Sequence, residues 1–577
     1  MTPTNKTSYT HHSSSDDNDS CLDTTRSGDR YVPLHDKSIH AGENNNRRDK
    51  PTSCRRHRQV TSGHSLSRLD SMLHEDHSKS LRPSRCLYVT VAIALLGAFQ
   101  FGWLMSELNY KQFHAKDPKT GKNVCNNAAF LTHYPDMCIM FPPHSQKEWT
   151  MATTSWIAGG GFGALFSGIP ADAVGRKYGL ALNALIMIAG AVVQASAGSI
   201  YTMAAGRFVS GIASGASANI AHILVSEITP SSMRGFFLTG LQIGISFGAF
   251  MVTTVHYAMN SHAYTWRLLV GAPIGIGLIQ LALLPFMEES PVWLISKGRI
   301  DQARTALGRL YLFHNTEAIL RALIRSDADM KEELQSTKQW HMLFSAKYRK
   351  QLLIACVLCA MQQLSGINAV MYYSASIFNR VGIHDPRYAN TIVNAARLHD
   401  ILLAAKLLDK FNRRTLLMAG MTVMALAGGG LVASLCNKDH EATHYTAVAS
   451  MVFFVASYCI SIGPISWIVA NEIFPDFLNA RAGAFGTFFT WVCNFLVGVY
   501  FQQMADPTNM GDYAFLTFSG CLMLAVLFVY LCVPETNHKS YREIQIAFGI
   551  DDPEPPSVLQ DDDIWETEEA RADGRPF

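Results

Sequence analysis

The feature that most constrains this chain is a series of apolar segments, each long enough to cross a lipid bilayer. A spanning segment needs about 20 mainly apolar residues, and a helix is one of the few structures that satisfies its own backbone in hydrocarbon. The chain of 577 residues is 48% hydrophobic and only 16% charged, so we expect an all-α membrane protein. Twelve spans are predicted, near residues 86–104, 153–171, 178–198, 201–225, 235–258, 265–287, 352–378, 389–408, 414–436, 444–470, 482–504 and 512–533.

The polar segments divide the chain into regions of different composition. The beginning is rich in Ser, His, Asp, Asn and Arg and cannot bury enough apolar surface to order itself. The middle contains periodic apolar residues that predict short amphipathic helices on a membrane face, and the end is acidic. We expect a disordered tail (1–84), a six-helix bundle (85–287), a helical linker (288–350), a second six-helix bundle (351–533) and an acidic tail (534–577).

Basic residues gather in the loops that twelve spans would place on the same side as both termini. They include Arg176, Arg234, Arg413 and Arg481, together with the basic residues between 299 and 350. Because cytosolic loops carry an excess of Lys and Arg, we expect both termini to be cytosolic. The plasma membrane is the expected location, with a vacuole-like organelle as the alternative, and no signal peptide is recognised.

Most of the 12 cysteines lie singly in apolar runs, which is not the pattern of a secreted disulfide framework. Cys125 and Cys138 are different because they lie in a polar loop, where a disulfide can form if the loop faces an oxidising side. The sequence has no catalytic triad, phosphate loop or metal-ligand cluster. We therefore expect a protein that is not an enzyme, with no cofactor or metal, and the net charge of +2 does not indicate nucleic-acid binding.

The span from Leu352 to Phe378 carries polar side chains in its middle, namely Gln362, Gln363, Ser365 and Asn368. Such residues should face a bundle interior or a wet cavity, not lipid. One interpretation is that they hold neighbouring helices together. The other is that they bind a ligand that is itself rich in hydroxyl groups.

The two halves repeat short charged motifs at a separation of about 240 residues, as expected for transporters built from structural repeats. DAVGRK at Asp172 recurs as DKFNRR at Asp409, and SEITPSSMRG at Ser226 recurs as NEIFPDFLNAR at Asn471. EESP at Glu288 is echoed by PET at Pro534. Each pair follows the corresponding span of its half.

With these motifs, the chain resembles the sugar porters of the major facilitator superfamily, especially the facilitative glucose (hexose) transporters. The resemblance covers residues from about Arg85 to Thr536 and also rests on GRF at Gly206, QQLSGINAVMYYS, and GPISW at Gly463. It implies a major facilitator fold in which two six-helix bundles move a hexose, with glucose as the expected substrate, by alternating access.

The resemblance also implies a gate of carboxylates and guanidiniums at the cytosolic helix ends, where such pairs can form and separate. An alternative is that these charges only anchor the helix ends at the interface. Asn412 and Asn479 depart from the family pattern, which has Gly and Arg there. The implied gate residues are Asp172, Arg176, Glu227, Arg234, Asp409, Arg413, Arg414, Glu472 and Arg481.

Amides suit a sugar because each offers both donors and an acceptor, and an indole offers a flat apolar face. Cys459 stands where glucose carriers of this family often have a glutamate, and Thr490, His222 and Leu224 are further departures. The implied sugar-binding residues are Gln242, Gln362, Gln363, Asn368, Asn394, Trp467 and Asn494.

Proton-coupled members of the family carry an aspartate in the first span where this chain has Leu104. We therefore expect passive uniport, with a proton–sugar symporter as the alternative. Glu107 is the nearby carboxylate that could couple protons, and it is expected near the outer, solvated end of the span. A sugar receptor that does not transport is the alternative from another class.

The eighth span is unusual because it contains Arg397, His399, Asp400 and Lys406. At helical spacing Asn394, Arg397 and Asp400 share one side, so we expect Arg397 and Asp400 to form an ion pair facing the cavity. His399 points away, and Lys406 can extend to the interface. A locally abnormal segment with impaired transport is the alternative.

Overall fold

The computed structural model describes residues 82–109, 146–257, 265–312, 317, 319–325, 342–383, 385–437, 440, 442–474, 476–537, 539 and 541–549. The chain divides into two compact units, Met1–Val60 and Thr61–Phe577, and all described residues belong to the second. Residues 1–81 and 550–577 of the expected tails lie outside the described residues, as do Cys125, Cys138 and the side chains of Lys406 and Asp409. The first part of the expected acidic tail is ordered, because it forms the helix Tyr541–Ala547, whose Gln545 is buried and donates to the Ile473 carbonyl at 3.1 Å.

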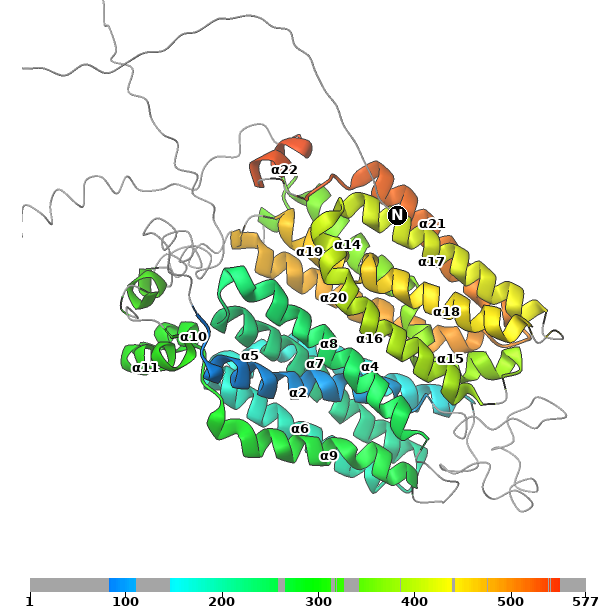
Figure 1. The fold of residues 1–577 in the computed structure, drawn as a ribbon, viewed down its shortest axis with the longest axis horizontal. Coiled ribbons are helices and arrows are strands. Elements are labelled where there is room, and N and C mark those ends of the chain that lie inside the picture. Colours follow the sequence, from blue (N-terminus) through cyan, green and yellow to red (C-terminus); the bar gives the residue numbers. More distant parts are fainter. Residues whose placement is uncertain are drawn as a thin grey trace, which may run out of the picture. The chain divides into compact units, whose positions relative to one another are not determined.

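The first set of helices, here called the N-terminal half, runs from α2 to α9. Within it, α7 packs on α4 and α6, α2 packs on α8, and α6 packs on α9. Figure 1 shows these helices in blue to green, side by side. Their bounds are α2 (Arg85–Ser106), α4 (Gln146–Phe166), α5 (Gly168–Val174), α6 (Arg176–Ala195), α7 (Ile200–Ile228), α8 (Ser231–Val255) and α9 (Thr265–Leu283).

The second set, the C-terminal half, runs from α14 to α21 and is yellow-green to orange in Figure 1. Here α17 packs on α18 and α21, while α14 packs on α19 and α20. The bounds are α14 (Arg349–Leu364), α15 (Ile367–Val381), α16 (Pro386–Lys410), α17 (Arg413–Cys436), α18 (Ala442–Ile460), α19 (Ile462–Glu472), α20 (Asp476–Met504) and α21 (Ala514–Cys532). The short helices η5 (Gly511–Tyr513) and α22 (Tyr541–Ala547) flank α21.

The described helices account for the twelve predicted spans. Ten continuous or gently bent segments are long and apolar enough to cross a membrane, and the pair α4 and α5, bent by 45°, makes an eleventh. The twelfth is α16, a 25-residue helix whose charges lower its hydropathy. Its buried residues still form one stripe that packs against α15, α18 and α8, so the structure has a helix at each of the twelve predicted spans.

Two of the spans in the C-terminal half are broken in the middle. α14 gives way to α15 at Gly366, whose φ of 87° is left-handed, and α18 gives way to α19 at Ser461. A left-handed residue without strain is normally glycine. Each break interrupts a helix midway along a span, at residues that are buried.

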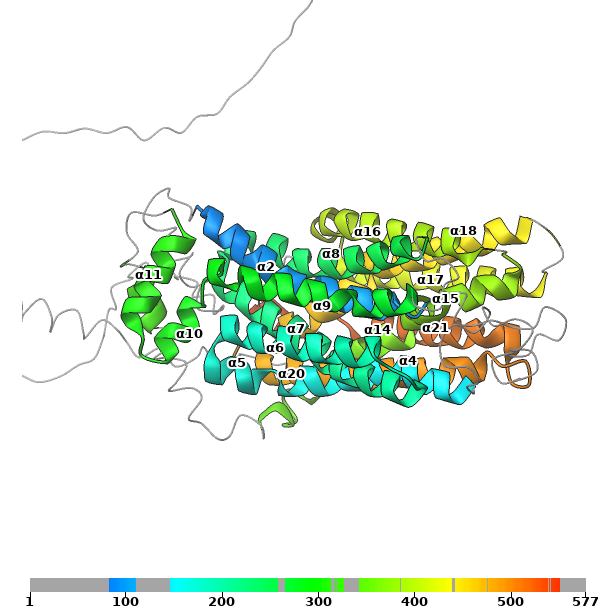
Figure 2. The same ribbon diagram turned by 90° about the horizontal axis from the view of Figure 1, so that it is seen from below.

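The segment between the halves contains η4 (Leu284–Phe286), α10 (Pro291–Ser296) and α11 (Ile300–Leu310). Figure 2 shows α10 and α11 at one end of the helix bundle, which we call the linker end. The opposite end, where α2 ends at Ser106, is called the far end. The amphipathic helix predicted here is confirmed, because α11 buries Ala303, Ala306, Leu307 and Leu310.

The linker is tied to the start of α2 by a short antiparallel bridge between Pro83 and Tyr311. The Ser84 amide donates to the Leu310 carbonyl at 2.9 Å, and the Tyr311 hydroxyl donates to the Ile228 carbonyl at 2.6 Å. The linker helices thus extend the apolar core of the N-terminal half.

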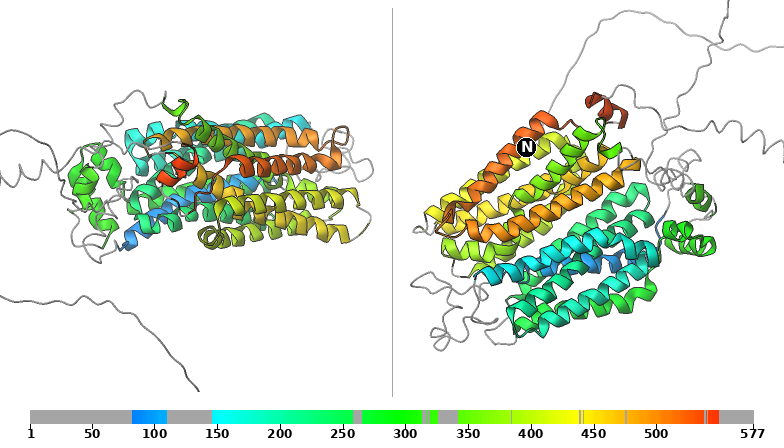
Figure 3. Two further views of the ribbon diagram at one scale, coloured as in Figure 1. Left: turned by 90° about the horizontal axis from the view of Figure 1, so that it is seen from above. Right: turned by 180° about the vertical axis from the view of Figure 1, so that it is seen from behind.

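The halves pack on one another through α8 with α16, α4 with α20, and α2 with α15. The two views of Figure 3 show the two sets of helices lying side by side. The resulting seam is the place where a site shared by both halves can form.

Candidate functional site

The predicted amide row lies at the break between α14 and α15, and its members bond to one another. Gln363 Nε2 donates to Gln362 Oε1 at 2.9 Å, and the Asn368 amide donates to Gln363. Gln362 in turn donates to the carbonyl of Gly463 on α19. All three amides are buried, so the row links the two broken helices of the C-terminal half.

Other predicted sugar residues surround this row in the same half. The Tyr372 hydroxyl of α15 donates to Asn494 Oδ1 on α20 at 3.1 Å. The amide of Asn394 donates to the Asn390 carbonyl at 2.9 Å, while its buried Oδ1 has no hydrogen-bond partner. Trp467 is half-buried on α19 and packs against the core of this half. Tyr372 and Asn494, here called the polar cluster, therefore join α15 to α20, whereas the hydrogen bond of Asn394 stays within α16.

Gln242 is the one predicted sugar residue in the N-terminal half. It is exposed on α8, and the hydrogen bonds found within the described ranges include none to it. The structure therefore does not bring Gln242 into contact with the amide row.

A contact between the halves that sequence reasoning missed lies at the far end. The Asn109 amide, three residues beyond α2, donates to the Met371 carbonyl at 2.9 Å and to Ser374 Oγ at 2.7 Å. Its Oδ1 accepts the backbone N–H of Ala375 at 2.9 Å. Little in the sequence indicates this contact, because Asn109 is an uncharged residue at a polar span end and its partners lie in the other half.

Glu107 is not solvated, contrary to expectation. Its side chain is fully buried and forms an ion pair with Arg207 of α7, which is itself 2% exposed. Arg207 also donates to the Leu104 carbonyl at 3.3 Å. The packing of α7 against α2 covers the carboxylate, and Arg207, which lies in the GRF motif, was not among the predicted site residues.

At the linker end of the N-terminal half, Arg176 is the centre of the predicted gate. Its guanidinium bonds to Glu227 twice, at 2.9 and 3.0 Å, and to Asp172 at 3.0 Å. Glu289, absent from the predicted set although its motif was noted, accepts the backbone N–H groups of Arg176 at 2.8 Å and Lys177 at 3.2 Å. Burial raises the pKa of Glu289, and these backbone donors oppose the rise.

The C-terminal half repeats this arrangement. Arg413 forms an ion pair with Glu472. Glu535 accepts the backbone N–H groups of Arg413 at 3.0 Å and Arg414 at 3.1 Å, as Glu289 does in the other half. The remaining predicted gate residues, Arg234 on α8 and Arg481 on α20, are half-buried.

The charges of α16 are arranged differently from the prediction. Arg397 and Asp400 are both buried on the same side of the helix, but the described ion pairs do not join them. Asp400 Oδ1 lies 3.1 Å from Nδ1 of His399, whose side chain is 75% exposed. Arg397 instead donates to the sulfur of Met371 at 3.1 Å.

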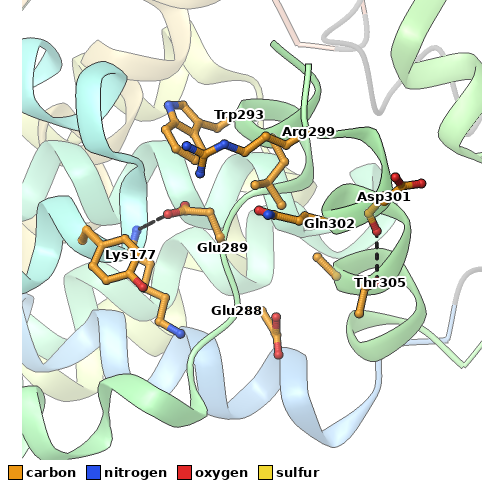
Figure 4. Close-up of a pocket in the computed structure, with 11 residues that line it drawn as sticks. Lys177, Glu288, Glu289, Trp293, Arg299, Asp301, Gln302 and Thr305 are labelled. Atoms are coloured by element: carbon orange, nitrogen blue, oxygen red, sulfur yellow. Dashed lines mark hydrogen bonds between the residues drawn. The ribbon is translucent and has the colours of Figure 1, made fainter. Parts of the chain in front are cut away.

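A separate cavity of about 380 Å³ lies at the linker end, between the start of α6 and the linker helices. Figure 4 shows Lys177, Glu289, Trp293 and Arg299 around it. Its carboxylates are engaged, since Glu288 pairs with Arg309 at 2.8 Å and Glu289 bonds to backbone amides. The cavity lies apart from the amide row.

The chain is similar to known proteins in both sequence and fold. Residues 89–548 match the family model described as "Sugar (and other) transporter". The chain is 31% identical over 486 residues to the human solute carrier family 2, facilitated glucose transporter member 4, covering 83% of this chain and 93% of the relative. It is 30% identical over 459 residues to plastidic glucose transporter 4 of Arabidopsis thaliana, covering 79% of each.

Solved structures share the fold. The inward-open conformation of the xylose transporter XylE from E. coli aligns with a TM-score of 0.65 and 22% identity, covering 80% of this chain and 99% of the other. The expected major facilitator fold is therefore confirmed. The match over residues 89–548, with the identity to curated relatives, shows that this multi-pass membrane protein belongs to the sugar transporter family.

Proposed function

We propose that the chain moves a hexose across its membrane by facilitated diffusion, with glucose as the first candidate because the curated relatives cited above are named glucose transporters. The proposed cycle makes and breaks no covalent bond. The bilayer and the small sugar are its partners, both termini are cytosolic, and the plasma membrane is the proposed location.

The observation that carries the proposal is the buried amide row at two broken helices. Gln362, Gln363 and Asn368 bond mainly to one another and to one carbonyl. A sugar hydroxyl both donates and accepts, so it can replace each of these bonds without leaving a buried polar group unsatisfied. Trp467 supplies the apolar face that the carbon-bound hydrogens of a pyranose need.

The charged clusters at the linker end support alternating access. Arg176 with Glu227 and Arg413 with Glu472 occupy equivalent places in the two halves. At the far end the halves are joined by Asn109 and α15. We propose that the cycle exchanges far-end contacts between the halves for contacts among the linker-end clusters, so that the sugar site opens to one side at a time.

Counterflow of labelled glucose into proteoliposomes tests this function. The full chain should show counterflow, and so should a chain that lacks residues 1–81 and 550–577. Gln362→Leu should weaken sugar binding by about tenfold or more, because it removes both bonds of one amide, while the protein still folds.

Two results would contradict this proposal. Sugar binding without counterflow would favour the receptor alternative, and wild-type affinity in Gln362→Leu would remove the amide row from the site.

Proton–sugar symport is a second candidate because of Glu107. The carboxylate of Glu107 is buried beside Arg207, and its Oε2 has no hydrogen-bond partner among the described residues. Among the described ion pairs, Arg207 is therefore the cation that stabilises the negative charge of Glu107. An inward proton gradient should then accelerate uptake, and Glu107→Gln should abolish that acceleration. Equal uptake rates with and without the gradient would leave facilitated diffusion as the mechanism.

A further inference from the structure

Arg397 is a buried cation that has no carboxylate partner among the described residues. Its exposed fraction is 8%, and no ion pair among the described residues includes it. Its contacts are with sulfur, namely Met371 Sδ at 3.1 Å and the thiol of Cys459. Sulfur atoms are weak acceptors, and a guanidinium removed from water needs strong ones. Among the described residues, Arg397 therefore has no charged hydrogen-bond acceptor.

Asp400 does not supply the missing acceptor. It lies one turn further along the same buried stripe of α16, yet its Oδ1 faces His399 and its buried Oδ2 has no hydrogen-bond partner. One turn before Arg397, the Oδ1 of Asn394 is also buried and without a partner. Along this side of α16, the guanidinium of Arg397 thus lies between two oxygen atoms, on Asn394 and Asp400, that have no hydrogen-bond partner among the described residues.

This stripe borders the proposed sugar site. Met371, which contacts Arg397, precedes Tyr372, and the Tyr372 hydroxyl donates to Asn494 of the polar cluster. Cys459 lies on α18 just before the break that leads to Gly463, the acceptor for Gln362. Arg397 therefore contacts α15 next to the polar cluster, and its contact on α18 lies just before the break that holds the acceptor of the amide row.

We propose that Arg397 is a specificity-determining residue that binds the carboxylate of a sugar acid, so that the transported substrates include a hexuronate. A neutral hexose offers only hydroxyl groups, whereas a carboxylate can accept two parallel bonds from one guanidinium. The sugar hydroxyls can donate to the unpartnered oxygens of Asn394 and Asp400. This inference rests on the proposed function, because it assigns a substrate class to the same site.

Competition in proteoliposomes that contain the full chain tests the inference. Glucuronate and galacturonate should compete with labelled sugar in the wild type. Arg397→Gln should lower the affinity for the uronates by about 30-fold or more, the loss expected when one partner of a buried charge pair is truncated. It should lower the affinity for glucose by less than about threefold. The control is Lys410→Gln, which removes an exposed cation at the end of the same helix and should change neither the uronate affinity nor the glucose affinity.

A second variant covers the case in which Arg397→Gln does not fold. Cys459→Glu places a carboxylate of the protein beside the guanidinium of Arg397. It should therefore lower the affinity for the uronates by a similar factor, while glucose is still transported. Uronate competition that survives both substitutions would overturn the inference, and so would its absence from a wild type that transports glucose. A wild type that transports neither kind of sugar would instead overturn the proposed function.

Discussion

Gly366 holds the left-handed backbone that separates α14 from α15. A Cβ at this position would lie 2.5 Å from the ring of Phe518, and the φ of 87° disfavours any other residue. Gly366→Ala should therefore lower the free energy of unfolding by about 2–4 kcal/mol through backbone strain and overpacking. Thermal unfolding in detergent measures the effect.

The control for this substitution is Gly520→Ala on α21, where a Cβ would meet no atom within 4 Å. It should leave the unfolding temperature almost unchanged, because a helical alanine is intrinsically favoured over glycine. An equal shift in both variants would show that the break at Gly366 has no special requirement for glycine.

Single residues also show where the sequence was insufficient. Glu107 lies near a span end, and its position in the chain predicted solvation. Its burial depends on Arg207, which lies 100 residues further along the chain. Likewise the helical spacing of Arg397 and Asp400 predicted their shared side correctly, but the partner of each was set by side-chain geometry that spacing does not contain.

At the scale of elements, α4 and α7 approach so closely that glycines are required between them. A Cβ on Gly215 would lie 2.0 Å from the carbonyl oxygen of Gly160. That oxygen belongs to a helix backbone and cannot move alone, so Gly215→Ala should separate the helices and cost about 1–3 kcal/mol of stability. A lower unfolding temperature and slower glucose counterflow are expected.

Gly235→Ala on α8 is the matched control, because a Cβ there meets no atom within 4 Å. If Gly215→Ala unfolds at the same temperature as this control, then the contact between α4 and α7 is looser than the structure indicates.

Element identity was well predicted because it depends on local composition. The apolar runs predicted the spans, and even α16 was recognised although its charges lower its hydropathy. The break at Gly366 coincides with a glycine, the residue that adopts a left-handed backbone without strain.

At the scale of the whole molecule, Asn109 joins the halves at the far end through three hydrogen bonds to α15. Each such bond contributes about 1 kcal/mol net. Asn109→Ala should therefore shift the population of the two states by tenfold or more towards opening at this end. Faster amide hydrogen exchange in residues 367–381 is the expected result.

The control for this shift is Asn437→Ala, because the described hydrogen bonds join the exposed Asn437 amide to the Ala433 carbonyl of its own helix and not to the other half. It should leave exchange in residues 367–381 unchanged. Unchanged exchange in Asn109→Ala as well would mean that other seam contacts hold the far end closed.

The sequence by itself determined the spans, the linker helix, the repeated charged motifs and the amide row. These features follow from composition and spacing along the chain, because the bilayer thickness sets the length of a span and the helix period sets which residues share a side. Tertiary structure alone decided which of these residues meet. It paired Glu107 with Arg207, joined Asn109 to α15, and left Arg397 without a carboxylate partner among the described residues. Such contacts join helices that are distant in sequence or depend on side-chain orientation.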